Sequence, residues 1–393
     1  MKTEQSSTHI MQNYARFPLT LVKGQGSRVW DDQGKSYLDF VAGIAVNALG
    51  HAHPAMVKTI SEQAATMLHC SNLYFIPQQT KLANRLAALS GLDKVFFCNS
   101  GAEANEAAIK IIRKYFCDQG SPRRTIITAT QSFHGRTMQT LAATGQDKVK
   151  AGFDPLPTGF LHVPLNDIEA LKAAIDDNTA AIMLEPVQGE GGVNHTITAY
   201  LNEVRALCDA HGLLLAFDEI QTGIGRCGKM FGFEISGVQP DILTLAKGLG
   251  GGVPIGAMLA SDTIAPALSA GSHGTTFGGN PMSCAVANTI LDVIEEEGIL
   301  VNVQQRSIQL KAGLQQLVDK YDFLSEVRGS GLLLGLASTI EVMPIINACR
   351  ENGLLVLGAG PNVLRLLPAL NITAVEVTEA LELLEQSIEG LDL

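Results

Sequence analysis

The sequence predicts an α/β protein with a largely parallel sheet and a second, smaller α+β domain. Between about 92 and 285, short apolar runs alternate with helical stretches. Buried strands that alternate with helices are typical of a parallel sheet with helices on both faces. Beyond about 286 the pattern changes to long amphipathic helices and short strands, which indicates the smaller domain.

The elements expected in the chain follow from these patterns. Residues 1–45 start polar and then contain strand patterns at 19–22, 28–30 and 37–40 with a turn at 31–34, so we expect a hairpin that packs with the small domain. The large domain at 46–285 has apolar runs at 94–98, 125–129, 180–184, 213–217 and 242–246 and helical stretches that include 102–116 and 200–210. The small domain at 286–393 has helices at 303–320 and 376–389 and strands at 331–336 and 363–367. Thr373 and Glu376 form a possible capping box.

Composition narrows the class of partner. The net charge of the 393 residues is −11, which argues against binding to nucleic acid or to an acidic membrane surface and favours a small molecule. The seven cysteines are scattered without a Cys-x-x-Cys pair, so we expect no disulfide framework and a reducing cytoplasm. His51 and His53 lack further ligands nearby in the sequence, so we expect no metal. The start, MKTEQSSTHI, lacks the apolar region of a signal peptide, and we expect no membrane span.

Polar side chains follow the apolar runs. In a parallel sheet the ligand lies beyond the carboxyl ends of the strands. Lys247 ends the run at 242–246 just before several glycines. A lysine there is poorly solvated, which lowers its pKa and makes the nucleophilic amine of Schiff-base chemistry accessible. An isolated lysine is more often an ordinary surface residue, so the remaining strand ends must support this interpretation.

Other strand ends offer complementary groups. Asp218 follows a buried strand and suits a cation such as a protonated pyridine nitrogen, with Gln221 three residues on; the alternative is a carboxylate that caps the next turn. Ser100 and Glu103 read as a capping box, which leaves the N–H groups of Gly101 and Ala102 for a phosphate, although an ordinary capped helix fits equally well. In SFHGRT, at 132–137, Phe133 could stack on a planar ring and Arg136 could grip a carboxylate.

Together these residues resemble the class III, fold-type I pyridoxal-phosphate aminotransferases. The motifs that carry the resemblance are NSGAEANEAA at 99–108, SFHGRT at 132–137, EPVQGEGG at 185–192, FDEIQTGIGR at 217–226, LAKGLGGGVPIGA at 245–257 and HGTTFGGNP at 273–281. Within the family the sequence is most similar to the acetylornithine aminotransferases, especially in AGIAVNALGH at 42–51. The resemblance implies a large domain with a mostly parallel sheet of the seven-stranded type.

The resemblance also implies the cofactor, pyridoxal 5′-phosphate, and the residues that hold it. Lys247 would form the Schiff base and move the proton during catalysis, and Asp218 would keep the ring nitrogen protonated. Phe133 would stack on the ring and Gln221 would contact its phenolic oxygen. The phosphate would be held by Ser100, Gly101 and Ala102 together with Thr276 from a partner subunit. A homodimer with a shared active site is therefore implied.

The substrate residues are implied in the same way. Arg136 would bind the substrate α-carboxylate, and Tyr14 matches a family position near the substrate side chain. Glu190 would neutralise Arg365 while an amino donor is bound and release it to bind the distal carboxylate of 2-oxoglutarate. The context of Arg365 departs from the family only in having Ala369 where a second proline is expected.

The implied reaction converts N2-acetylornithine and 2-oxoglutarate to N-acetylglutamate 5-semialdehyde and glutamate, a step of arginine biosynthesis. Ile44 stands where ornithine aminotransferases resemble one another in having tyrosine, which favours an N-acylated donor. N-succinylornithine, N-succinyl-diaminopimelate, ornithine and 4-aminobutyrate remain alternative donors, because a few side chains can change the preference of a pocket.

Overall fold

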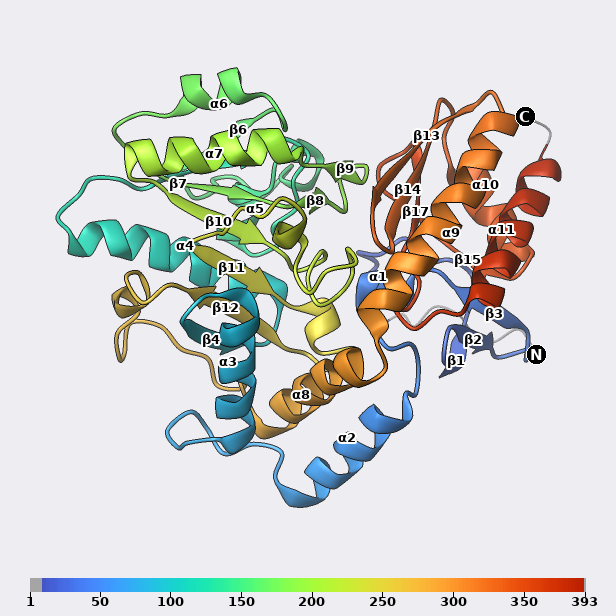
Figure 1. Cartoon of the computed structure of the whole chain (residues 1–393), viewed down its shortest axis with the longest axis horizontal. Helices are drawn as coiled ribbons and strands as arrows, with labels where there is room; N and C mark the ends of the chain where they lie inside the picture. Colours follow the sequence, from blue (N-terminus) through green and yellow to red (C-terminus); the bar gives the residue numbers. More distant parts are fainter. Residues whose placement is uncertain (1–8, 392–393) are drawn as a thin grey trace.

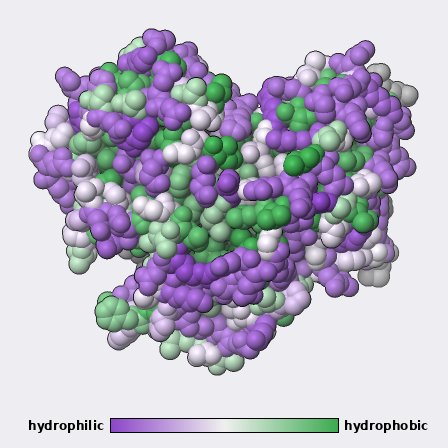
Figure 2. Space-filling view, viewed as in Figure 1, coloured by the Kyte–Doolittle hydropathy of each residue, from purple (hydrophilic) through white to green (hydrophobic). Residues whose placement is uncertain are grey.

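The protein, described here by a computed structural model over residues 9–391, has a large α/β part and a smaller α+β part that lie side by side (Figure 1). Residues 1–8 of the expected N-terminal segment and the last two residues of the expected small domain lie outside the described residues. Figure 2 shows one face largely covered by hydrophilic residues, with hydrophobic residues gathered between the two lobes. Within the described range, no helix is both long and apolar enough to span a bilayer.

A seven-stranded sheet forms the centre of the large part, in the order β4-β12-β11-β10-β7-β5-β6. Its strands are β4 (Lys94–Cys98), β5 (Thr125–Ala129), β6 (Phe160–Val163), β7 (Thr179–Leu184), β10 (Leu214–Asp218), β11 (Ile242–Leu245) and β12 (Gly256–Ala260). β12 alone runs opposite to the other six strands, so the expected mostly parallel sheet is confirmed. The sequence patterns identified five of these strands and missed β6 and β12.

Helices cover both faces of this sheet because alternate strand residues point to opposite sides. Ala216 packs in a cluster with residues of α4 (Gly101–Asp118), whereas Leu215 and Phe217 belong to a cluster on the other face. That second cluster includes residues of α3 (Pro77–Ser90), α7 (Thr198–His211) and α8 (Pro281–Glu296). The remaining short elements are α1 (Ala42–Ala45), α2 (Pro54–Thr66), α5 (Met138–Ala143), α6 (Ile168–Ala174), β8 (Val187–Gln188) and β9 (Asn194–His195).

The smaller part is a four-stranded sheet, in the order β13-β14-β17-β16, with helices packed against it. Its elements are α9 (Ile299–Lys320), β13 (Leu324–Ser330), β14 (Leu333–Ser338), α10 (Met343–Glu351), β16 (Leu357–Gly358), β17 (Val363–Leu366) and α11 (Ala374–Glu389). Helices α8 and α9 lead from the large part to the small one (Figure 1). The capping box of Thr373 and Glu376 is present at the start of α11.

The N-terminal strands belong to a sheet that the C-terminal region completes. The strands β1 (Leu21–Gln25), β2 (Arg28–Asp31) and β3 (Ser36–Asp39) form an antiparallel meander. The short strand β15 (Leu354–Leu355) then pairs in parallel with β3. The hairpin thus lies beside the small sheet (Figure 1). The division at 45/46 and 285/286 stays a prediction, and the second boundary falls inside α8.

Candidate active site

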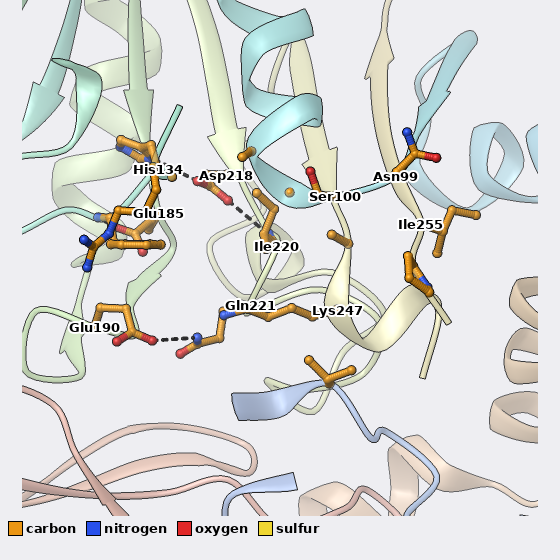
Figure 3. A pocket seen from close by; sticks show the side chains of 18 of the residues that line it. Asn99, Ser100, His134, Glu185, Glu190, Asp218, Ile220, Gln221, Lys247 and Ile255 are labelled. Atoms are coloured by element: carbon orange, nitrogen blue, oxygen red, sulfur yellow. Dashed lines mark hydrogen bonds and ion pairs between the residues drawn. The ribbon is translucent and has the colours of Figure 1, made fainter. Parts of the chain in front are cut away.

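A cavity of about 460 Å³ opens at the carboxyl ends of the large sheet. Side chains from the ends of β4, β7, β10 and β11 converge on it (Figure 3). Of the residues expected in a site, it is lined by Ser100, Gly101, Ala102, Phe133, Arg136, Glu190, Asp218, Gln221 and Lys247. Segments far apart in the sequence therefore meet where the strand pattern places a ligand.

Lys247 follows β11 by two residues and lies in the left-handed region of backbone conformation, with φ of 42°. Its side chain extends into the cavity (Figure 3) and makes no hydrogen bond or ion pair within residues 9–391. Burial lowers the pKa of Lys247 to about 8, against the opposing influence of Glu190. A substantial fraction of the amine is thus neutral and nucleophilic near physiological pH.

Asp218 is the last residue of β10, and its carboxylate is held from several directions. Its Oδ2 atom accepts hydrogen bonds from His134 Nδ1 and Asn105 Nδ2, both at 2.7 Å. Its Oδ1 atom accepts the backbone N–H of Ile220 at 3.1 Å. With only 4% of Asp218 exposed, this network fixes the orientation of the carboxylate at the cavity wall.

The N-terminus of α4 forms another wall. The Ser100 hydroxyl accepts the N–H of Glu103 at 3.2 Å, as expected for a cap. The reciprocal bond of the expected capping box differs, because the Glu103 carboxylate accepts the N–H of Asn99 instead of that of Ser100. The N–H groups of Gly101 and Ala102 have no partner within the described residues, as the first turn of a helix predicts, and they can receive an anion.

The loop after β5 supplies an aromatic ring and a cation. The N–H of Phe133 donates to Glu185 Oε2 at 3.1 Å, which anchors the loop to the residue after β7. The Arg136 guanidinium lies 5.5 Å from the centre of the Phe133 ring. Arg136 has no acidic partner in the part of the chain that the structure describes, so its charge is available to a carboxylate at the cavity.

An ion pair closes one side of the cavity. Arg365 of β17 is almost fully buried, and its Nη1 atom lies 2.8 Å from Glu190 Oε1 and 2.6 Å from the carbonyl oxygen of Gly189. Gln221 joins both partners, because its Oε1 atom accepts from Arg365 at 3.2 Å and its Nε2 atom donates to Glu190 at 3.4 Å. Burial is the largest single influence on the pKa of Glu190 and raises it, but the charge and hydrogen bond of Arg365, together with Lys247 and Gln221, lower that pKa overall.

Three expected residues do not line the cavity, namely Tyr14, Thr276 and Arg365, and the Arg365 guanidinium lies behind Glu190 and Gln221. Tyr14 is 69% exposed, beside Arg16 in the N-terminal segment. Thr276 is exposed in the loop before α8. Ile44 lines a neighbouring cavity beneath the N-terminal segment, whereas Val46 of the same turn reaches the active-site cavity.

Several residues at the site lie in the strand-end motifs of the sequence but received no role there. Ile220 lines the cavity against Gly101, where a Cβ atom would approach Ile220 Cδ1 to 2.7 Å. His134 and Asn105 hold Asp218 from behind, and Glu185 borders the cavity. Burial, together with the Asp218 charge, holds the pKa of Glu185 well above its usual range. The local signals for this group are the position of His134 between Phe133 and Arg136 and that of Glu185 directly after the apolar run at 180–184.

The comparisons with known proteins decide the family. The class-III aminotransferase family matches residues 10–388. The chain is a class-III aminotransferase. It is 51% identical over 385 residues to the acetylornithine aminotransferase of Caldanaerobacter subterraneus subsp. tengcongensis, covering 98% of both chains. It is 48% identical to the acetylornithine/succinyldiaminopimelate aminotransferase of Yersinia pestis, covering 97% of this chain and 96% of the relative.

A solved structure agrees with this class-III aminotransferase in fold. The ornithine aminotransferase of Toxoplasma gondii, in a crystal with partial occupancy of PLP at its active site, superposes with a TM-score of 0.93. It is 34% identical in sequence, and the match covers 96% of this chain and 92% of that one. The resemblance to class-III aminotransferases and the fold-type I architecture are thus confirmed.

The class-III aminotransferase is an enzyme that depends on pyridoxal phosphate, and the geometry of its cavity fits that group. The free N–H groups of Gly101 and Ala102 suit a phosphate. The buried carboxylate of Asp218 suits a protonated ring nitrogen, and the unpaired amine of Lys247 suits an aldehyde. Gly101 also allows the close approach of Ile220, whose apolar side chain provides a wall for a planar ring.

Proposed function

We propose that the enzyme transfers the terminal amino group of N2-acetylornithine to 2-oxoglutarate, giving N-acetylglutamate 5-semialdehyde and glutamate in arginine biosynthesis. The observation that carries this proposal is the ion pair of Glu190 and Arg365 at the wall of the cavity that contains Lys247. A paired arginine leaves room for a donor without a second anionic group. Once unpaired, the same arginine binds a carboxylate of 2-oxoglutarate, so one cavity serves both substrates.

The choice of donor is supported by two further features. The acetylornithine aminotransferase of Caldanaerobacter and the Yersinia pestis relative, each about half identical over nearly the whole length, carry names that include acetylornithine. Ile44 is an aliphatic residue where ornithine aminotransferases resemble one another in having tyrosine, so the chain lacks a hydroxyl there for a free amino acid. N-succinyl-diaminopimelate is the second candidate donor, because the name of the Yersinia pestis relative includes it.

The geometry of the cavity supports a set of cofactor roles. When bound, pyridoxal phosphate supplies an electron-withdrawing ring that stabilises negative charge at the reacting carbon of the substrate. Ser100, Gly101 and Ala102 would hold the phosphate, and Asp218 would hold the ring nitrogen. Phe133 and Ile220 would pack against the ring, and Gln221 would bind the phenolic oxygen.

Lys247 and the arginines handle the substrate. The Lys247 amine would hold the cofactor through its aldehyde, and Nζ would take up and return the proton of the reacting carbon. Its lowered pKa of about 8 makes both protonation states accessible during the cycle. Arg136 orients the substrate through its α-carboxylate. Tyr14, which does not line the cavity in the single chain, is assigned a contact with the substrate side chain in the assembled enzyme.

We further propose a homodimer in which Thr276 completes the phosphate site of the partner subunit. An exposed apolar patch, the loop patch, lies next to the loop of Thr276. Its members are Leu68, Leu73, Tyr74, Phe75 and Phe277. Asn72 Nδ2 donates to the carbonyl oxygen of Gly278 at 2.9 Å, which holds the two loops together. An apolar patch of this kind favours burial against another chain.

We assign the enzyme to the cytoplasm, on the basis of its cysteines. All seven are free, and five of them are buried. Free thiols in this number suit a reducing compartment.

The proposal is tested by separate half-reactions of the cofactor-loaded enzyme, followed by absorbance. Acetylornithine should react at least tenfold faster, in kcat/KM, than ornithine or 4-aminobutyrate, with succinylornithine and succinyl-diaminopimelate as the comparisons that distinguish the acyl group. Ornithine reacting as fast as acetylornithine would refute the use of Ile44. Succinyl-diaminopimelate reacting as fast as acetylornithine would establish the second candidate.

The switch role is tested by Arg365→Ala. The variant should impair the 2-oxoglutarate half-reaction more than the acetylornithine half-reaction, because only the former requires the free guanidinium. Equal losses in both half-reactions would refute the assigned role. The variant Arg328→Ala is the matched control, because Arg328 is another arginine of the same small sheet that pairs with Glu326 instead of Glu190.

A further inference from the structure

Gln221 lies between two parts of the active site that the proposed function treats separately. Its amide oxygen accepts from Arg365 Nη1 and its amide nitrogen donates to Glu190 Oε1. Figure 3 shows the hydrogen bond between Gln221 and Glu190. The same side chain is assigned to the phenolic oxygen of the cofactor. One amide thus touches both members of the ion pair and faces the cofactor.

The surroundings prevent this amide from turning independently. Gln221 is 8% exposed. A Cβ atom on Gly189 would lie 1.8 Å from Gln221 Oε1, so the absence of a side chain at 189 is what admits the amide. The backbone leading to it is fixed by the hydrogen bond from Ile220 N to Asp218 Oδ1 at 3.1 Å. Because the backbone is fixed and the space is confined, the Gln221 amide changes position only when its hydrogen-bond partners change.

The ion pair supplies the event that changes those partners. Arg365 Nη1 carries two hydrogens but faces three acceptors, namely Gly189 O, Glu190 Oε1 and Gln221 Oε1. Arg365 Nε is buried without a partner in the described part of the chain and is free to donate to an incoming carboxylate. When that carboxylate displaces Glu190, Gln221 loses the donor and the acceptor it shares with the pair. A buried amide without partners is costly, so it takes up others within reach.

We infer that Gln221 couples the Glu190–Arg365 ion pair to the cofactor, so that opening of the pair by a substrate carboxylate alters the hydrogen bond on the cofactor's phenolic oxygen. This inference rests on the proposed function, which supplies the cofactor contact and the switch. Its consequence is that binding of the dicarboxylate changes the hydrogen bonding of the cofactor before any reaction occurs. Such coupling is reciprocal, so the cofactor in turn influences how readily the pair opens.

The test uses absorbance of the cofactor-loaded enzyme, without turnover. Glutarate has both carboxylates of 2-oxoglutarate but lacks the keto group, so it opens the pair and cannot react. The measured quantity is the shift in the spectroscopic pKa of the cofactor on saturation with glutarate. We expect a shift in the unaltered enzyme and a shift at most half as large in Gln221→Met, which keeps the length of the side chain and removes the amide.

A matched control and a second pair of variants distinguish the Gln221 amide from a general loosening of the cavity. Gln188→Met removes another buried glutamine amide, one that binds Thr130 O and Asn194 away from the cavity, and it should keep the full shift. Glu190→Gln opens the pair without any ligand, so its effect on the spectroscopic pKa is measured both alone and combined with Gln221→Met. This arm remains informative if Gln221→Met weakens glutarate binding.

The outcomes separate the inference from the function on which it rests. A shift of equal size with and without the Gln221 amide, in both arms, means that the charges of the pair act on the cofactor directly and overturns the inference alone. Loss of the full shift in Gln188→Met as well would also overturn it, since the effect would then be a general loosening. A protein that shows no cofactor absorbance, or no half-reaction with 2-oxoglutarate, would overturn the proposed function itself.

Discussion

His134 Nδ1 lies 2.7 Å from Oδ2 of Asp218, and both side chains are buried. This contact links the loop of Phe133 and Arg136 to the end of β10. Two groups assigned to the substrate and the ring are thereby positioned relative to the carboxylate assigned to the ring nitrogen. Residues that orient a catalytic group through such a second layer of contacts are needed for its precision.

We predict that His134→Leu lowers kcat and weakens cofactor retention while the fold is preserved. A hydrogen bond to a charged group contributes about 1.5–3 kcal/mol, which corresponds to a loss of roughly tenfold to a hundredfold. Stopped-flow half-reactions and cofactor dialysis measure both effects. His162→Leu is the control, because this partly buried histidine contacts Thr128 and Lys150 instead of Asp218. Similar losses in the two variants would contradict the prediction.

Lys247 leads to a prediction about stability. Burial lowers its pKa from 10.5 to about 8, so the folded protein binds this proton more weakly than the unfolded chain does. The charged lysine then destabilises the fold fully below pH 8, and the penalty disappears as the pH rises from 8 toward 10.5. Without cofactor, Lys247→Met should be more stable than the unaltered protein by roughly 3 kcal/mol at neutral pH.

This prediction is checked by denaturant unfolding of the apoprotein between pH 6 and pH 10.5, a range that includes both pKa values of Lys247. The advantage of Lys247→Met should shrink through the upper half of that range. Lys58→Met, at a side chain that is 74% exposed, should leave the stability nearly unchanged. A Lys247→Met apoprotein less stable than the unaltered one at neutral pH would be inconsistent with the lowered pKa.

The loop patch leads to a prediction about assembly. Phe75 is completely exposed in the single chain, and burying such a side chain contributes about 1.5–3 kcal/mol in each copy of the interface. If the proposed homodimer forms through this patch, Phe75→Glu should shift the protein from dimer to monomer and reduce activity through the loss of Thr276 from the partner site. Light scattering gives the mass. Val375→Glu, at an exposed apolar residue on α11 far from this loop, should remain dimeric.

A substitution at Gly189 should displace the amide of Gln221 without changing any charge in the cavity. A methyl group there would lie 1.8 Å from Gln221 Oε1, and its backbone φ does not require glycine. Gly189→Ala should raise the KM for 2-oxoglutarate by about tenfold, since displacing a hydrogen-bonded amide costs on the order of 1 kcal/mol or more. The acetylornithine half-reaction is the comparison. A uniform loss in both half-reactions would indicate general disruption of the cavity.

Local sequence predicted those parts of the site that depend on strand ends. Lys247 and Asp218 each follow a run of buried apolar residues, so their positions could be inferred from the pattern alone. By contrast, β12 consists largely of small residues, and β6 has His162 among its apolar residues and is only partly buried. Neither is an unbroken run of large apolar residues, by which a buried strand is recognised.

Contacts between distant segments could not be predicted from local pattern. Asn105 lies in a helix among alanines, and its contacts with Asp218 and Thr244 depend on how α4 packs on the sheet. The reciprocal bond of Glu103 goes to Asn99 because the chain turns sharply before α4. The family motifs supplied Glu190 and Arg365 as a pair, since 175 residues separate them in the chain.

The pairing of β3 with β15 has a consequence for the order of folding. The partner of Leu38 in the sheet is Leu354. The N-terminal meander is therefore synthesised early, but the edge of β3 stays unpaired until almost the whole chain has been made. Contacts of such long sequence separation form late and slow the folding of a domain. An exposed strand edge in the interval invites pairing with other chains. Chains that stop short of β15 should therefore aggregate during synthesis, even though every residue of the cofactor cradle in the large sheet has already been made.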